Sequence, residues 1–286
     1  MKGWCFTVFY FFVLCCFAQR SVQVAYDVDY HVAANQETKK IELTCLIPQT
    51  LTGIQQLEDI TFSIPPDSVF TDQGNKYAYF LFSDAKAPFV LSIHADLSIT
   101  SNDLAGAVHD TDDHAIAQYL VAEQYIESEA ENIAELATQL KKKDDLATVK
   151  NIFAFIRNKM HYSGYNPNEV GASKALAASH GDCTEFADLF VALCRANHIP
   201  ARVLEGFTTE SQNVSVHNWA EVFLKDIGWV RFDPTAPVLK GLKNRYVQLS
   251  SIRNDQKLQN KHFYCYRYWG TSVAVKMVDN VKVKQN

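Results

Sequence analysis

Hydrophobic and polar residues alternate with a period of two along the first part of the chain, from Val24 onward. That period is typical of β-strands, in which successive side chains point to opposite faces of a sheet. Turn residues such as Asp72-Gln73-Gly74-Asn75 separate the alternating runs, and no helical period intervenes. The pattern predicts an antiparallel β-sandwich-like domain over residues 19–104, with strands in the runs 24–32, 41–47, 60–64, 77–82 and 89–99.

The period changes to that of amphipathic helices after residue 116. One helix is expected to begin at a capping box, Ser128-Glu129-Ala130-Glu131, and a second after Asp144. A third follows Gly181-Asp182 and must end before Pro200, because proline cannot continue a helix. The stripes expected to face the core are Ile133, Leu136, Ala137 and Leu140; Val149, Ile152, Phe153, Ile156 and Met160; and Phe186, Leu189, Phe190 and Leu193.

A period of two returns after these helices, first at 201–207 and then at 215–224 and 229–233. The turn Asp226-Ile227-Gly228 joins the last two runs into a β-hairpin. Later strand-like runs, Tyr246–Leu249 and Phe263–Val275, are expected to extend the same sheet. Helices between two strand-rich segments indicate an α+β fold.

The two patterned regions predict two domains. The sandwich-like domain occupies residues 19–104, and a catalytic domain of helices and antiparallel sheet occupies 116–286. The stretch 105–115 is expected to be a linker because it contains the acidic run His109-Asp110-Thr111-Asp112-Asp113-His114. The alternative for that run is a metal site, since histidine and carboxylate side chains are metal ligands.

Residues 1–18 differ from the rest of the chain. Lys2 is followed by an apolar stretch too short to span a bilayer, and Cys16-Phe17-Ala18 has small residues at the positions that signal peptidase requires. We therefore expect a signal peptide cleaved after Ala18, which makes the protein secreted or periplasmic. The alternative is a short membrane anchor lipidated at Cys15 or Cys16. No later segment is long and apolar enough to cross a membrane.

Composition narrows the function classes. The 286 residues carry a formal net charge of −5, which argues against a nucleic-acid-binding protein because such proteins normally present a basic face. Four cysteines would remain after cleavage, and none has the C-x-x-C spacing of zinc or redox sites. No cofactor or metal is expected. Cys194 is expected in the core, and a bridge between Cys45 and Cys265 is left open.

One cysteine is placed for chemistry. Cys183 directly follows Asp182 at the start of the third helix, where free N–H groups and the helix dipole favour a thiolate. The hairpin turn brings His217 and Asp233 toward each other, one residue pair out of register, which a bulge could absorb. A thiol nucleophile needs a base, and the base needs an acceptor that fixes its tautomer. The alternative is that these three residues never meet.

Three stretches of the sequence resemble motifs of a known family. The stretches GDCTEFADLFVALCRANHIPAR, HNWAEVF and GWVRFDPT closely resemble the transglutaminase-like superfamily of cysteine enzymes, over roughly residues 116–240. The resemblance implies a papain-like core with a central catalytic helix packed on an antiparallel sheet. It further implies Cys183 as nucleophile, His217 as general base and acid, and Asp233 as the orienting partner of the histidine.

Two positions depart from the family pattern. Asn218 stands where members often have a small or apolar residue, and no upstream side chain is clearly the oxyanion donor. Tyr162 is a candidate donor, but the interpretation favoured for it is a core aromatic, because most large aromatic side chains simply pack.

The expected function is hydrolysis of peptide or amide bonds through a thioester, on a peptide or protein substrate. The alternatives are amine transfer to glutamine, as in a transglutaminase, and a non-enzymatic binding module.

Overall fold

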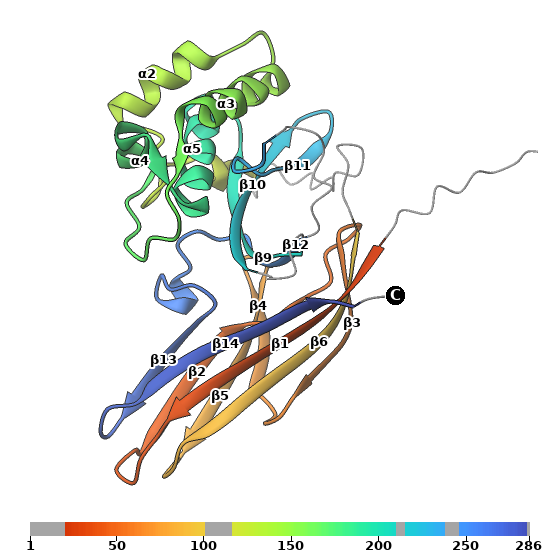
Figure 1. The fold of residues 1–286 in the computed structure, drawn as a ribbon, viewed down its shortest axis with the longest axis vertical. Helices are drawn as coiled ribbons and strands as arrows, with labels where there is room; N and C mark the ends of the chain where they lie inside the picture. Colours follow the sequence, from red (N-terminus) through yellow and green to blue (C-terminus); the bar gives the residue numbers. More distant parts are fainter. Residues whose placement is uncertain (1–20, 101–115, 210–214, 238–245, 285–286) are drawn as a thin grey trace, which may run out of the picture.

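The computed structural model describes residues 21–100, 116–209, 215–237 and 246–284. The predicted signal peptide, the alternative anchor cysteines and the His109–His114 run lie outside these residues. Two units stand end to end in Figure 1, a β-sandwich and a second unit in which helices cover a curved sheet. The architecture is α+β, as the sequence predicts.

The sandwich consists of two antiparallel sheets. One has the strand order β14-β1-β6-β3 and the other β13-β2-β5-β4. The strands are β1 (Ser21–Ala33), β2 (Lys40–Leu46), β3 (Gln55–Phe62), β4 (Ser68–Asp72), β5 (Asn75–Ser83), β6 (Phe89–Thr100), β13 (Tyr264–Trp269) and β14 (Ala274–Val283).

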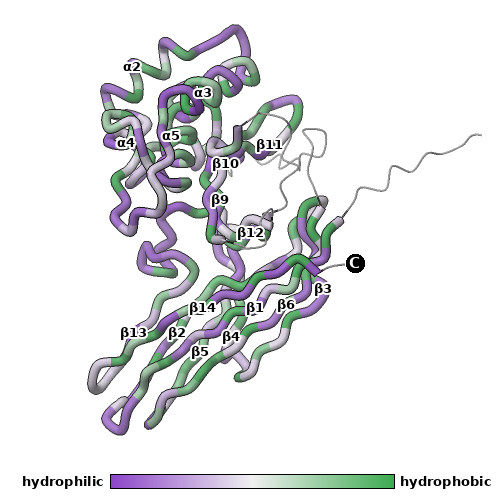
Figure 2. The backbone as a smooth tube through the Cα atoms, viewed as in Figure 1, coloured by the Kyte–Doolittle hydropathy of each residue, from purple (hydrophilic) through white to green (hydrophobic). Residues whose placement is uncertain are grey.

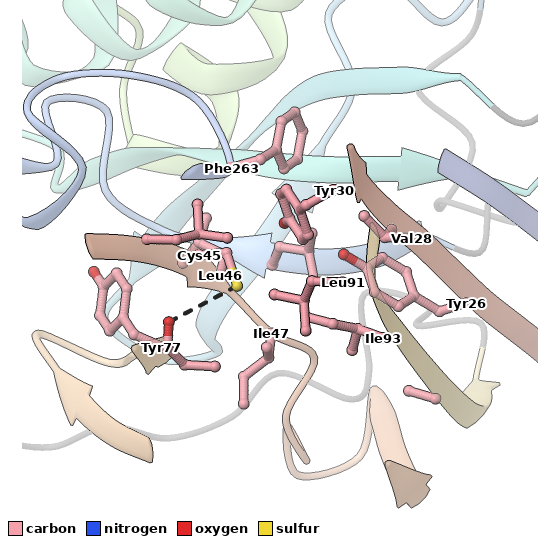
Figure 3. Packing of buried hydrophobic residues seen from close by; sticks show 14 of the residues in the cluster. Tyr26, Val28, Tyr30, Cys45, Leu46, Ile47, Tyr77, Leu91, Ile93 and Phe263 are labelled. Carbon is pink, nitrogen blue, oxygen red and sulfur yellow. Dashed lines mark hydrogen bonds between the residues drawn. The ribbon is translucent and has the colours of Figure 1, made fainter. Parts of the chain in front are cut away.

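Alternation along each strand produces the sandwich core. In β1 every second residue from Val24 to Val32 is buried, while the residues between them are more exposed. The same striping is visible as alternating green and purple along the lower strands in Figure 2. Figure 3 shows side chains from both sheets gathered in this core, including Tyr30 and Leu91 of one sheet and Cys45 of the other.

The last two strands of the chain belong to this sandwich. β14 pairs with β1 from Val24↔Val283 to Ala33↔Ala274, and β13 pairs with β2. The prediction that the run Phe263–Val275 extends the hairpin sheet is therefore wrong. Alternation shows that a strand buries one face, but it does not identify the neighbouring strand. The domain boundaries at 19–104, 105–115 and 116–286 stay predictions, and the strands after residue 263 pair with the N-terminal sheets.

The second unit places helices against a smaller antiparallel sheet. Its helices are α2 (Glu131–Leu140), α3 (Asp145–Lys159), α4 (Ala172–Ala178) and α5 (Cys183–Ala196), with a 3₁₀ turn, η1 (Gln118–Leu120). Its sheet has the order β11-β10-β9-β12, made of β9 (Ala201–Thr208), β10 (Val216–Leu224), β11 (Gly228–Phe232) and β12 (Tyr246–Ser250). A short parallel pair, β7 (His161–Tyr162) and β8 (His180–Gly181), precedes α5.

Helix α5 is the centre of this unit. It is buried from Thr184 to Arg195 and contacts the other three α-helices and the strands β9 and β10. Its start at Cys183 and the Asp144 cap of α3 confirm the sequence predictions. The capping box predicted at Ser128 is wrong, because α2 begins after Ala130 with no side-chain cap.

Buried polar contacts join the two units. The backbone carbonyl of Gln248 in β12 accepts a hydrogen bond from the side chain of Gln55, the first residue of β3, and the Gln248 N–H donates to the same side chain. Tyr77 of β5 donates to Asp255 at 2.7 Å. A second 3₁₀ turn, η2 (Gln256–Leu258), then leads the chain from the core into β13. Among the described residues, no helix has both the length and the apolar composition that crossing a membrane requires.

Candidate active site

Acceptors within the chain satisfy most of the backbone N–H groups at the N-terminus of α5, and one N–H group remains. The Asp182 carboxylate accepts the N–H of Thr184 at 2.8 Å and completes a capping box with Glu185, whose side chain accepts the N–H of Asp182. The N–H of Phe186 bonds the Asp182 carbonyl. The N–H of Cys183 therefore remains for a ligand at this end, since no described residue accepts it.

The hairpin places His217 beside Asp233. Ala220 of β10 pairs with Phe232 of β11, so Asp233 falls level with Trp219 and on the same face as His217. Nε2 of His217 lies 2.9 Å from Oδ2 of Asp233. The β10–β11 register contains no shift, so the bulge considered from the sequence is not needed.

Asp233 is fixed by several donors. Its Oδ1 accepts the N–H and the hydroxyl of Thr235, at 2.9 and 2.6 Å, while Oδ2 accepts the Tyr246 hydroxyl at 2.7 Å. Burial alone would raise the pKa of this carboxyl, but the bonds from His217, Thr235 and Tyr246 lower it. The aspartate is therefore an oriented anion that stays ionised.

His217 is hydrogen-bonded on both sides. Since Nε2 is engaged with Asp233, Nδ1 is the ring nitrogen left for the sulfur of Cys183, to which the imidazole is also hydrogen-bonded. Burial alone would lower the histidine pKa, yet the bonds and charges of Asp233 and Cys183 raise it to about 10. Trp219 and Tyr246 stack nearly parallel to the ring, at centroid distances of 6.3 and 5.7 Å.

The structure thus brings together the three residues singled out from the sequence. Cys183 comes from the start of a helix, His217 from a central strand and Asp233 from the residue after the neighbouring strand. The alternative in which they never meet does not describe this fold.

Asn218 and Tyr162, the two positions left open by the sequence, also lie at the site. Asn218 donates from Nδ2 to the Thr184 hydroxyl at 2.8 Å, which ties β10 to the first turn of α5. Tyr162 is 60% exposed, so its interpretation as a core aromatic is wrong. Its pKa is raised by partial burial and then by the neighbouring charges of Cys183 and Asp182.

A cleft of about 940 Å³ contains Cys183 and lies between the helical unit and the rim of the sandwich. One side comes from the segment after β7, which includes the 85% exposed Tyr165. The opposite side comes from the connection into β13 and from Met277 of β14. Further lining residues that the sequence did not single out include Tyr125, Glu169, Glu205, His262 and Phe263.

The other three cysteines in the described part of the chain lie away from the cleft. Cys45 and Cys194 are fully buried, Cys265 is nearly so, and all are free thiols. Burial raises the pKa of each, to about 12 for Cys45. Cys45 lies opposite Tyr264, and the next residue, Cys265, points to the other face of the sheet, so the two do not form the bridge left open above.

The described residues contain no group of three or more His, Cys, Asp or Glu side chains placed to hold a metal ion. The chemistry available at the site is that of a thiol, an imidazole and a carboxylate. A helix-borne thiol hydrogen-bonded to an oriented histidine can attack a carbonyl carbon, which is the first step of acyl transfer.

Comparison with known proteins agrees with this class of site. Residues 134–234, which include all three side chains, match the model of the transglutaminase-like superfamily. This part of the chain, which contains the helical unit and the hairpin, is therefore similar to that superfamily.

Individual relatives are distant. The "Uncharacterized protein YebA" of Bacillus subtilis (strain 168) is 34% identical over 89 residues, which are 26% of this chain and only 12% of that protein. The structure of a "Putative Cysteine Protease from Cytophaga hutchinsonii" has a TM-score of 0.65 and 20% identity and covers 91% of both chains, which shows the shared fold. The periplasmic domain of TgpA from Pseudomonas aeruginosa has a TM-score of 0.42 and 15% identity, covering 77% of this chain and 92% of that one.

Proposed function

We propose that the protein is a cysteine-dependent acyl-transfer enzyme that hydrolyses peptide or amide bonds. The observation that carries the proposal is His217, which bonds Asp233 on one side and Cys183 on the other and has its pKa raised to about 10. A histidine held in this way beside a helix-start cysteine can take the thiol proton and form a thiolate–imidazolium pair.

Each residue then has one role. The Cys183 thiolate attacks the substrate carbonyl, and His217 donates its Nδ1 proton to the leaving amine. A thioester remains on Cys183. His217, now neutral, takes a proton from water as the water attacks the thioester, and the acid and the free thiolate are regenerated. Asp233 holds the ring orientation and stabilises the imidazolium.

The oxyanion of both tetrahedral intermediates needs donors. The cap accepts hydrogen bonds from the neighbouring N–H groups but not from that of Cys183, so this N–H is available to the oxyanion. The Tyr162 hydroxyl is our candidate for the second donor, since its ring packs on Phe186 of the first turn of α5, at 6.2 Å between centroids.

Substrate and location follow from the same proposal. A cleft of about 940 Å³ lies at the upper end of the size range of small-molecule pockets, and its opening to solvent leaves access for a peptide or protein chain. The apolar N-terminal stretch supports export to the periplasm or the exterior, where such substrates would be met.

Water is favoured over an amine as the acyl acceptor. A transglutaminase must shield its thioester from water, and the two tryptophans of the hairpin, Trp219 and Trp229, are side chains that could form such a shield. Both are buried within the sheet, and neither lines the cleft. This observation supports hydrolysis over amine transfer.

The test is to identify the products that the protein forms from peptides and to ask whether their formation requires Cys183. The protein is incubated with a peptide library, with and without a millimolar primary amine, and the products are identified by mass spectrometry. Hydrolysed peptides are expected, and amine-linked products would instead support a transglutaminase. Cys183→Ala should abolish product formation, whereas Cys265→Ala, which also removes a thiol, should not. The absence of product with the unaltered protein would support the binding-module alternative.

A further inference from the structure

The wall of the cleft opposite the sandwich is a loop anchored at both ends. It consists of residues 164–171 and is called the wall segment below. The cleft is lined by five of its residues, Tyr165, Asn166, Pro167, Asn168 and Glu169. Gly164 and Gly171 have φ angles of +80° and +83°, a region that favours glycine. The segment has no helix or strand of its own, so other contacts must hold it in place.

Two of these contacts come from the start of α5. The N–H of Asn166 donates to Asp182 at 3.0 Å, and the N–H of Val170 donates to Glu185 at 3.4 Å. The capping box that positions Cys183 therefore also holds the backbone of the wall segment.

The strongest contacts come from a part of the chain outside the superfamily match. Glu169 faces two cations, with His262 Nε2 at 2.6 Å from Oε1 and Arg253 at 3.2 Å from Oε2. Both cations belong to the connection that runs from β12 into the sandwich strand β13. His262 also bonds Glu205 of β9 through Nδ1, so its imidazole spans two carboxylates on different sides of the cleft.

Arg253 links the wall segment to the helix that carries Cys183. It makes a bidentate pair with Asp188, a fully buried residue of α5, at 2.7 and 3.0 Å. The guanidinium also lies 4.7 Å from the ring centre of Tyr125, another cleft residue. One side chain thus contacts two residues that line the cleft, Glu169 and Tyr125, and the helix that carries Cys183.

Glu169, Arg253 and His262 stay charged, whereas burial raises the pKa of Asp188 to about 7 despite its pairing with Arg253. Burial alone would raise the pKa of Glu169, but the bonds from His262 and the charge of Arg253 lower it to about 2. The pKa of His262 is raised to about 10, first by the charge of Glu205 and then by its bond to Glu169. The contacts of Glu169 with Arg253 and His262 are therefore ion pairs at neutral pH, in a partly buried setting where they are less screened than on the surface.

We propose that Arg253 and His262 are positioning residues of the candidate active site: through Glu169 they fix the wall segment in the place where a peptide substrate binds. The sandwich thereby takes part in substrate binding through the connection that leads into β13. The substrate part of this inference rests on the proposed function, while the fixing of the wall segment does not.

Glu169→Gln is the test variant because it removes the shared carboxylate without leaving a cation alone. Arg253 keeps Asp188, and His262 keeps Glu205. The matched control is Glu42→Gln in the sandwich. Glu42 also lies between two cations, Lys40 at 2.5 Å and Arg267 at 2.7 Å, and it is remote from the cleft. Arg253→Lys, which retains the charge and loses the bidentate geometry, should give an intermediate effect.

Two alkylating probes of Cys183 separate positioning from general damage. Iodoacetamide tests only the reactivity of the sulfur, whereas a dipeptide chloromethyl ketone must also bind along the cleft. Glu169→Gln should slow the peptide probe about tenfold and leave the iodoacetamide rate unchanged, because only the peptide uses the wall. An equal effect on both probes, or on neither, would overturn the proposal.

Hydrogen exchange decides the inference independently of catalysis. The amides of residues 165–170 should exchange faster in Glu169→Gln and in His262→Gln than in the unaltered protein, and Glu42→Gln should not change them. Unchanged exchange in both cleft variants would overturn the fixing of the wall segment. If the unaltered protein reacted with neither probe at Cys183, the proposed function would fail. Hydrogen exchange would still show whether Glu169 and His262 fix the wall segment.

Discussion

At His217, burial and hydrogen bonding act on the protonated ring in opposite directions. Burial disfavours the charged form, while Asp233 and Cys183 favour it, and the bonds prevail because the carboxylate is itself held by Thr235 and Tyr246. The stacked rings of Trp219 and Tyr246 leave the imidazole little freedom to turn away. The site is therefore preorganised before any substrate arrives.

The variant Asp233→Asn tests how strongly the protonated form of His217 depends on the Asp233 carboxylate. The pKa of His217 is about 10 in the folded protein against an ordinary 6.5, so its proton stabilises the fold fully below about pH 6.5 and progressively less up to about pH 10. The variant should lose about 3 kcal/mol at pH 6, measured by denaturant unfolding, and the difference should shrink toward pH 10. Hydrolysis should fall by roughly 10⁴-fold, as in other triads.

The control for that variant is Asp226→Asn, an exposed aspartate in the turn of the same hairpin. It should change neither stability nor rate. A stability difference for Asp233→Asn that stayed constant from pH 6 to pH 10 would contradict the link to the histidine proton.

At the scale of elements, the first turn of α5 combines structure and chemistry. The Asp182 carboxylate caps the helix, leaves the Cys183 N–H free and accepts the N–H of Asn166 from the wall segment. Strand β12 is equally constrained. A Cβ on Gly206 of β9 would lie 1.9 Å from the Val247 carbonyl oxygen, so only glycine lets β12 approach with Tyr246 in reach of Asp233.

Asp182→Ala and Asp144→Ala form a matched pair of cap deletions. Each removes an aspartate that caps an α-helix, and each should cost about 1 kcal/mol in thermal unfolding, with Asp182 at the upper end because it is buried. Only Asp182→Ala should also slow alkylation of Cys183 by iodoacetamide. Equal alkylation rates in the two variants would show that the cap does not contribute to the reactivity of the cysteine.

At the scale of the whole molecule, the last two strands of the chain pair with its first two strands. After the hairpin and β12, it re-enters the sandwich and places β14 beside β1 and β13 beside β2. The two units are thus linked by covalent connections at both ends of the helical unit, and the second connection carries Arg253 and His262. The sandwich is therefore an integral part of the molecule that holds the site.

Deleting residues 263–286 should unfold the sandwich although most of its strands remain. The deletion exposes one edge of β1 and one edge of β2 and removes their partner strands from a fold whose net stability is typically only ~5–15 kcal/mol. Circular dichroism and size-exclusion chromatography should show lost cooperative melting and aggregation. Removing residues 285–286 alone should have no effect, and a cooperative, monomeric long deletion would refute the expectation.

Local signals in the sequence determined much of this structure. Alternation fixed which residues of β1 and β6 are buried, and the glycine, aspartate and apolar stripe at 181–193 fixed the start of α5, because these effects act within a few residues. The order of Cys183, His217 and Asp233 with an intervening hairpin was sufficient to predict their meeting. Their chemical roles remain a proposal.

Partners distant in sequence were decided only by the tertiary structure. Burial alternates in the same way whichever strand lies alongside, so the pairing of β14 with β1 leaves no local signature. The same holds for Glu169, Arg253 and His262, because a charged residue in a loop does not indicate its counter-ion. Periodicity and capping are short-range and were readable from the chain, whereas sheet order and ion pairing depend on which surfaces the fold brings together.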